Sequence, residues 1–215
     1  GIDGDGGQIE TSGAVLNYDG IKVDTSSETG NYGSWLLDPT NLTVGSSEAS
    51  TYVSNLASTN VNVTADNTIT VNSAISYGGG RSNGTLTFTS ASTVLNANVG
   101  SSSNSLNVVF ASAVKLGADV TINTRGGDLT LNSTLDSNTS TAKGLTVSGS
   151  SGTATFSGNI GSTYRLSGID VTAGTINIGG NISTDASAGT YSTSSLGAAG
   201  WIRSDYNGYF GEWNN

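Results

Sequence analysis

The five residues Leu131-Asn132-Ser133-Thr134-Leu135 contain the pattern that predicts the fold: an apolar residue, three small or polar residues, and a second aliphatic residue. The same pattern recurs as the pairs Val71/Ile75, Leu95/Val99, Leu116/Val120, Phe156/Ile160 and Ile178/Ile182. The first members of successive pairs are 24, 21, 15, 25 and 22 residues apart, a mean of 21.4. A regular period of this size indicates a repeat architecture.

Each copy is predicted to form one coil of a right-handed parallel β-helix, a β-solenoid with coils of about 21 residues. The small residues between the paired positions allow the backbone to turn a corner. A further apolar strand position precedes each copy, at Val63, Phe88, Phe110, Ile122, Val147 and Val171. Because one coil cannot bury its inward side chains alone, we expect stacked coils with an interior stack of Val71, Leu95, Leu116, Leu131, Phe156 and Ile178.

An antiparallel β-sandwich is the competing fold, and it predicts hairpin turns every 8–12 residues instead of the longer repeat. The 15-residue step is the weakest point of the repeat, and indicates either a shortened coil or a misaligned copy. Three regions are expected: irregular coils in residues 1–50, regular coils in residues 51–200, and an aromatic tail in residues 201–215.

Composition excludes several function classes. The chain contains no Cys or His, so it has no thiol nucleophile, Ser-His-Asp triad or conventional zinc site. Its net charge of −9 disfavours nucleic acid and anionic lipid as partners. The absence of long apolar runs predicts no membrane insertion, and the absence of an initiator Met suggests a processed piece of a longer protein. We expect no cofactor.

The N-terminal third holds two motifs, Gly6-Gly7-Gln8-Ile9-Glu10-Thr11-Ser12-Gly13 and the WLLDPTNLTV segment of residues 35–44. This arrangement resembles the filamentous-haemagglutinin-like exoproteins and high-molecular-weight adhesins of Gram-negative two-partner secretion. The later segments GGDLTLNSTL (126–135) and GTINIGGNIS (174–183) are similar to the passenger repeats of that family. The resemblance implies a secreted β-helical stalk at the cell surface that acts in adhesion, aggregation or biofilm formation.

The C-terminal tail contains five aromatic residues, Trp201, Tyr206, Tyr209, Phe210 and Trp213. Three roles are open for them: a cap over the last coil, a docking element for a neighbouring subunit, or a glycan-binding cluster. The pair Asp3 and Asp5 is a weak calcium candidate, because the complete EF-hand spacing is absent and a solvated glycine-rich turn fits as well.

Two further readings concern the solenoid surface. Acid–base cleavage of polysaccharide would need clustered carboxylates, and Asp128, Asp136 and Asp170 are the candidates, with Lys115, Arg125 and Arg165 as bases. These acids fall in different coils, so we expect no enzyme activity. Threonine pairs such as Thr85/Thr87 and Thr153/Thr155 resemble the arrays of ice-binding solenoids. The array is expected to be broken, because the matching positions become Thr93/Leu95, Ala113/Lys115 and Thr175/Asn177.

The sequence therefore predicts a non-enzymatic, secreted adhesive rod on the surface of a Gram-negative bacterium. Its expected partners are other copies of the chain, neighbouring segments of the same exoprotein, and host or matrix glycans. The alternative is a subunit that assembles end to end into an extracellular filament.

Overall fold

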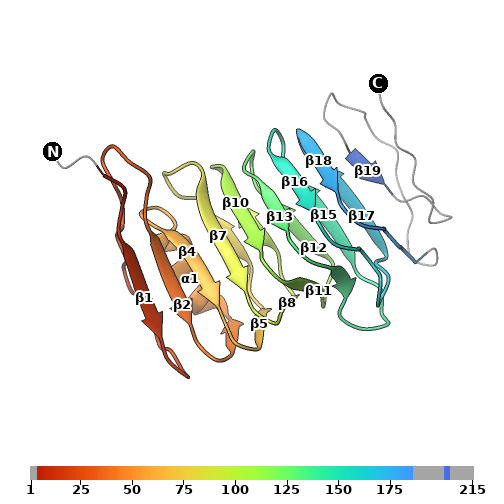
Figure 1. The fold of residues 1–215 in the computed structure, drawn as a ribbon, viewed down its shortest axis with the longest axis horizontal. Helices are drawn as coiled ribbons and strands as arrows, with labels where there is room; N and C mark the ends of the chain where they lie inside the picture. The colour runs from red at the N-terminus through yellow and green to blue at the C-terminus, as the bar shows by residue number, and fades with distance from the viewer. Residues whose placement is uncertain (1–3, 186–200, 204–215) are drawn as a thin grey trace.

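The structure, a computed structural model, describes residues 4–185 and the backbone of residues 201–203. Within these residues the chain is a β-solenoid of about seven turns, built from three parallel sheets and one short helix (Figure 1). Every strand pair is parallel except the last, β17 with β19. The parallel ladders exclude the antiparallel sandwich.

Sheet A holds eight strands: β1 (Gln8–Ser12), β2 (Ser34–Asp38), β4 (Asn60–Thr64), β7 (Gly84–Thr89), β10 (Leu106–Phe110), β13 (Leu129–Leu131), β16 (Thr153–Phe156) and β18 (Thr175–Ile178). Sheet B holds β3 (Leu42–Val44), β5 (Thr68–Val71), β8 (Ser92–Leu95), β11 (Ala113–Leu116) and β14 (Leu135–Ser137). Sheet C holds β6 (Ile75–Tyr77), β9 (Val99–Ser101), β12 (Val120–Asn123), β15 (Gly144–Ser148), β17 (Gly168–Thr172) and β19 (Trp201–Arg203). Each complete coil therefore contributes one strand to each sheet.

The register corrects the predicted interior stack. Val71, Leu95 and Leu116 are neighbours in sheet B. Leu131, Phe156 and Ile178 are neighbours in sheet A, where they continue a column that includes Leu37, Val63, Phe88 and Phe110. The six residues thus form two columns, one in sheet B and one in sheet A. The 15-residue step from Leu116 to Leu131 passes from the sheet B column to the sheet A column, so these two residues are not equivalent.

The error arose because both corners carry the same pattern of an apolar residue, three small or polar residues and an apolar residue. In the coil of β10 it occurs twice, at Phe110/Val114 and at Leu116/Val120. The six steps along sheet A from Leu37 to Ile178 span 141 residues, so the mean coil length is 23.5 residues and not 21.4. Individual coils range from 21 to 26 residues, because the corners differ in length.

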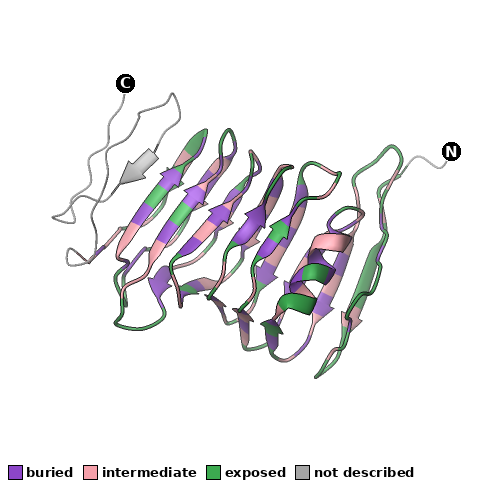
Figure 2. Cartoon of the chain, turned by 180° about the vertical axis from the view of Figure 1, so that it is seen from behind, coloured by how far each residue is buried: buried purple, intermediate pink, exposed green. Residues whose placement is uncertain are grey.

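The core is one continuous cluster of inward side chains that extends from Tyr18 to Ala173. Along most strands, buried residues alternate with partly or fully exposed ones, as the burial colours of Figure 2 show, whereas β9 and β14 are buried throughout. Phe88 and Phe110 stack inside this column, with ring centroids 5.3 Å apart. Ile178 departs from the predicted burial, since 37 % of its surface is exposed: β18 is the last described strand of sheet A.

The N-terminal end contains a helix that the sequence reading did not predict, α1 (Ser46–Asn55). It takes the place of a sheet C strand and packs beside β6, the first strand of that sheet. Ala49 and Tyr52 are buried on its inner face and Leu56 is buried directly after it, a helical spacing that was not predicted from the sequence. Glu48 accepts a hydrogen bond from the Gly45 N–H at 2.9 Å and fixes the first turn.

The segment before β2 folds over α1 and closes this end of the core. Tyr18 stacks on Tyr52, and their hydroxyl groups are 2.6 Å apart. The buried side chain of Asn55 accepts the Val23 N–H at 2.7 Å and donates to the Ile21 carbonyl at 2.9 Å. The predicted boundary at residue 50 falls inside α1, so both regions share one core.

The inward direction of the sheet B column can be tested with Leu116→Asp. Leu116 is fully buried, so the variant places an unpaired carboxylate in the core and should lose more than about 4 kcal/mol of stability. Val94→Asp is the matched control, because Val94 points outward beside Lys115 and its loss should stay within about 1 kcal/mol. Equal melting temperatures for the two variants would contradict the register.

The tyrosine pair predicts a loss of stability at alkaline pH. Burial raises the pKa of Tyr18 from 10.0 to about 12 and raises the pKa of Tyr52 well above its usual range. The folded state holds these protons more tightly than the unfolded chain, so the free energy of unfolding should fall as the pH rises from 10 through 12. Chemical denaturation across this range should show a weaker pH dependence in the double variant Tyr18→Phe/Tyr52→Phe. An unchanged slope would contradict the burial of this pair.

Candidate functional site

The outer face of sheet A is the most regular surface of the described residues. Its two outward columns from β4 to β18 contain Asn60, Asn62, Thr85, Thr87, Asn107, Val109, Asp128, Thr130, Thr153, Thr155, Thr175 and Asn177. Ten of these twelve positions are Thr or Asn. Parallel neighbours lie about 4.8 Å apart, so the face presents hydroxyl and amide groups at a constant spacing along the solenoid.

Hydrogen bonds between coils hold these side chains in place. Asn60, Asn107 and Asp128 each accept the backbone N–H of a residue in the next coil, at distances of 2.8–3.1 Å. In the second column Asn177 donates to the Thr155 hydroxyl at 3.3 Å. The outward polar residues therefore stabilise the stack as well as forming its surface.

The threonine pairs and two of the three positions matched to them in the sequence fall on different sheets. Thr85/Thr87 and Thr153/Thr155 share the two outward columns of sheet A. Thr93/Leu95 and Ala113/Lys115, which were matched to them, belong to sheet B. A strict Thr-x-Thr array is still broken, because Asn107/Val109 and Asp128/Thr130 lie between the two pairs.

The carboxylates considered for catalysis lie apart and make structural contacts. Asp128 in sheet A accepts the Thr153 N–H at 2.8 Å, and Asp136 in sheet B accepts the Thr163 N–H at 2.8 Å. Asp170 points outward from sheet C. Of the basic candidates, Lys115 lies beside Asp136 in the sheet B ladder. The three acids belong to three different faces, so they do not form a carboxylate pair.

The calcium candidate is described only in part. Asp5 accepts the Asn31 N–H at 2.8 Å and so holds the turn before β2. Asp3 lies outside the described residues. Across residues 4–185, no group of three or more His, Cys, Asp or Glu side chains is arranged to hold a metal ion.

The aromatic tail is also described only in part. Trp201 lies in β19, which pairs antiparallel with β17 and places Trp201 opposite Thr172. Tyr206, Tyr209, Phe210 and Trp213 lie outside the described residues. Capping, subunit docking and glycan binding stay predictions for these five residues.

The contacts around Arg81 were not predicted from the sequence. Its guanidinium group lies 4.2 Å from the centroid of the Tyr32 ring and donates to the Asn60 side chain. Burial lowers the pKa of Arg81 from its usual range. Arg81 is far from Tyr32 and Asn60 in the sequence and meets them only through the stacking of coils. No local sequence pattern therefore reveals these contacts.

The two N-terminal motifs lie side by side. The strands β1 and β2 pair in parallel, and the Trp35 indole N–H donates to the Thr11 hydroxyl at 3.0 Å.

No helix in the described part of the chain has the length and apolar character needed to cross a membrane. A scan against protein-family models and searches of curated proteins and solved structures returned no match. The resemblance to two-partner-secretion exoproteins stays a prediction.

Proposed function

We propose that this chain is a segment of a secreted bacterial surface rod whose role is structural and adhesive, not enzymatic. The supporting observation is the outer face of sheet A, a regular polar surface held rigid by hydrogen bonds from coil to coil. A rigid surface loses little conformational freedom on contact, which favours weak contacts repeated over many coils. The resemblance of the N-terminal motifs to exoprotein adhesins supports the same role.

Beads coated with the purified chain test this proposal. Wild-type beads should adhere to epithelial cell layers and to one another more than beads coated with denatured chain. Thr87→Glu/Thr155→Glu, which adds two charges to the outer face of sheet A, should lower adhesion about tenfold, equivalent to about 1.4 kcal/mol.

The matched control is Thr70→Glu/Thr146→Glu, with the same substitutions on the outer faces of sheets B and C. This variant should adhere like the wild type. If it loses as much adhesion, the sheet A face is not the contact surface. If wild-type beads adhere no better than denatured ones, the adhesive role is wrong.

End-to-end assembly into a filament is the second candidate, and the two ends of sheet A favour it. Ile9 in β1 belongs to an inward column but is 42 % exposed, and Ile178 at the other end is 37 % exposed. Pairing of β1 in one copy with β18 in another would bury both residues and continue the parallel ladder. Seven acidic residues and one basic residue in positions 4–60 make the opposite, head-to-head contact unfavourable.

Ile9→Lys tests this second candidate, because it places a charge at the open edge of β1. Electron microscopy over a range of concentrations should show fibres for the wild type and separate short rods for the variant. Val15→Lys is the control, since Val15 is 90 % exposed and lies outside any strand, and it should still form fibres. Short rods for the wild type at every concentration would exclude the filament.

A further inference from the structure

Two corners between sheets B and C are longer than the others. Three earlier corners, at residues 72–74, 96–98 and 117–119, contain three residues each. The next corner has six residues, 138–143, and the one after it spans residues 161–167, between Ile160 and β17. In solenoids, insertions collect as loops on one face, which is often the binding face.

Buried polar side chains hold the two loops together. Ser137, which is fully buried, donates its hydroxyl to the Arg165 carbonyl at 2.8 Å and accepts the Lys143 N–H at 2.9 Å. Its own N–H donates to the Tyr164 carbonyl at 3.0 Å. Asp136, only 6 % exposed, accepts the Thr163 N–H. These bonds fix the backbone on both sides of Tyr164.

The start of the second loop also requires glycine. Gly161 has a φ of +70°, and a Cβ atom there would lie 2.0 Å from the Ser183 carbonyl oxygen of the next coil. The chain can therefore leave the sheet at this point only without a side chain. The loop begins in one defined direction, which agrees with its fixed backbone at Tyr164.

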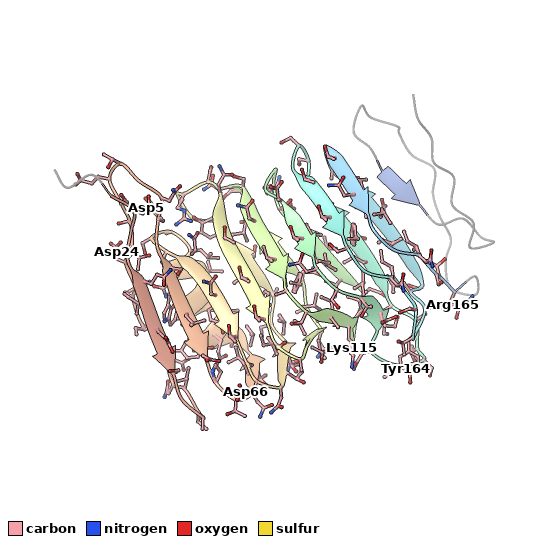
Figure 3. The ribbon with its side chains drawn as sticks, in the orientation of Figure 1. Asp5, Asp24, Asp66, Lys115, Tyr164 and Arg165 are labelled. Atoms are coloured by element: carbon pink, nitrogen blue, oxygen red, sulfur yellow. The ribbon has the colours of Figure 1, made fainter. Side chains whose placement is uncertain are left out.

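The exposed side chains of this surface bear hydroxyl, amide or charged groups, with one aromatic ring. Tyr164 is 43 % exposed, and Ser162, Thr163 and Arg165 beside it are exposed as well. Figure 3 shows Lys115, Tyr164 and Arg165 along the same border of the molecule. The neighbouring apolar residues Leu135 and Ile160 are each only 1 % exposed, so an apolar partner would find no apolar groove here.

The charges of this surface balance. Lys115, Lys143 and Arg165 are the bases, and the acids beside them are Asp119, Asp136 and Asp185. A polyanion gains little from a surface with three charges of each sign. A hydroxyl-rich neutral ligand fits better, because carboxylate, guanidinium and hydroxyl groups all hydrogen-bond sugar hydroxyls and the tyrosine ring covers the apolar face of a sugar ring.

We propose that loops 138–143 and 161–167 form a binding site for a neutral polysaccharide, with Tyr164 as the stacking residue and Arg165 as a hydrogen-bond donor. The site gives the proposed adhesive rod a specific glycan contact, and in that respect it rests on the proposed function. It lies on a different face from the outer columns of sheet A, so the two can be tested separately.

Native gel electrophoresis of the full chain through gels that contain a soluble polysaccharide tests the site. The probes are dextran, galactomannan and xyloglucan as neutral polymers, and dextran sulfate as a polyanion. At least one neutral polymer should retard the wild type, at low salt and in 0.5 M NaCl alike, because no net charge contributes to the binding. Tyr164→Ala should weaken binding at least about tenfold, whereas Tyr164→Phe, which keeps the ring, should bind like the wild type.

Arg165→Ala should weaken binding. Lys22→Ala is its control, because this substitution removes an exposed base at the far end of the solenoid.

No retardation by any neutral polymer overturns the site. Retardation by dextran sulfate alone, or equal binding by Tyr164→Ala and wild type, also overturns it. If wild-type beads adhere but no neutral polymer retards the chain, the rod's adhesive role stands and this site is wrong. If wild-type beads do not adhere but neutral polymers retard the chain through Tyr164, the site stands without the adhesive role.

Discussion

The in-register parallel stacking of coils is the constraint on which the rest of the structure depends. Each inward side chain lies on its counterpart in the coils before and after, as Phe88 lies on Phe110. An inward residue is therefore buried mainly by the coils on either side of it, and a coil has no core of its own. Backbone hydrogen bonds and side chains such as Asn107 and Asp128 join the same coils from the outside.

This constraint separates the inside of the solenoid from its surface. The inward columns are filled mostly by apolar residues, and a buried carboxylate outside those columns, Asp136 beside Lys115, accepts the Thr163 N–H. The corners carry no such restriction and vary from two residues to seven. Functional differences between coils can therefore arise in the corners and on the outer faces, where the proposed contacts lie, without a change in the core.

The sequence predicted the architecture correctly because the repeat of apolar pairs is a property of every coil. It failed on the register, since the corner after Phe110 and the corner after Leu116 have the same residue pattern. Helix α1 was not predicted because it is only ten residues long and half of them are Ser or Thr, so its few apolar positions give a weak helical period. The contact of Arg81 with Tyr32 and the clamp around Ser137 join residues from different coils, so they follow only from the correct register.

Distance measurements between spin labels along one outward column of sheet A test the account most directly. The chain has no cysteine, so each introduced cysteine is a unique attachment site. Glu10 and Val109 are four coils apart and Glu10 and Asn177 seven, which gives backbone separations of about 19 Å and about 34 Å. Label distances that increase by about 15 Å between the two pairs would agree with the stacked register. Equal distances, or a shorter distance for the second pair, would contradict it.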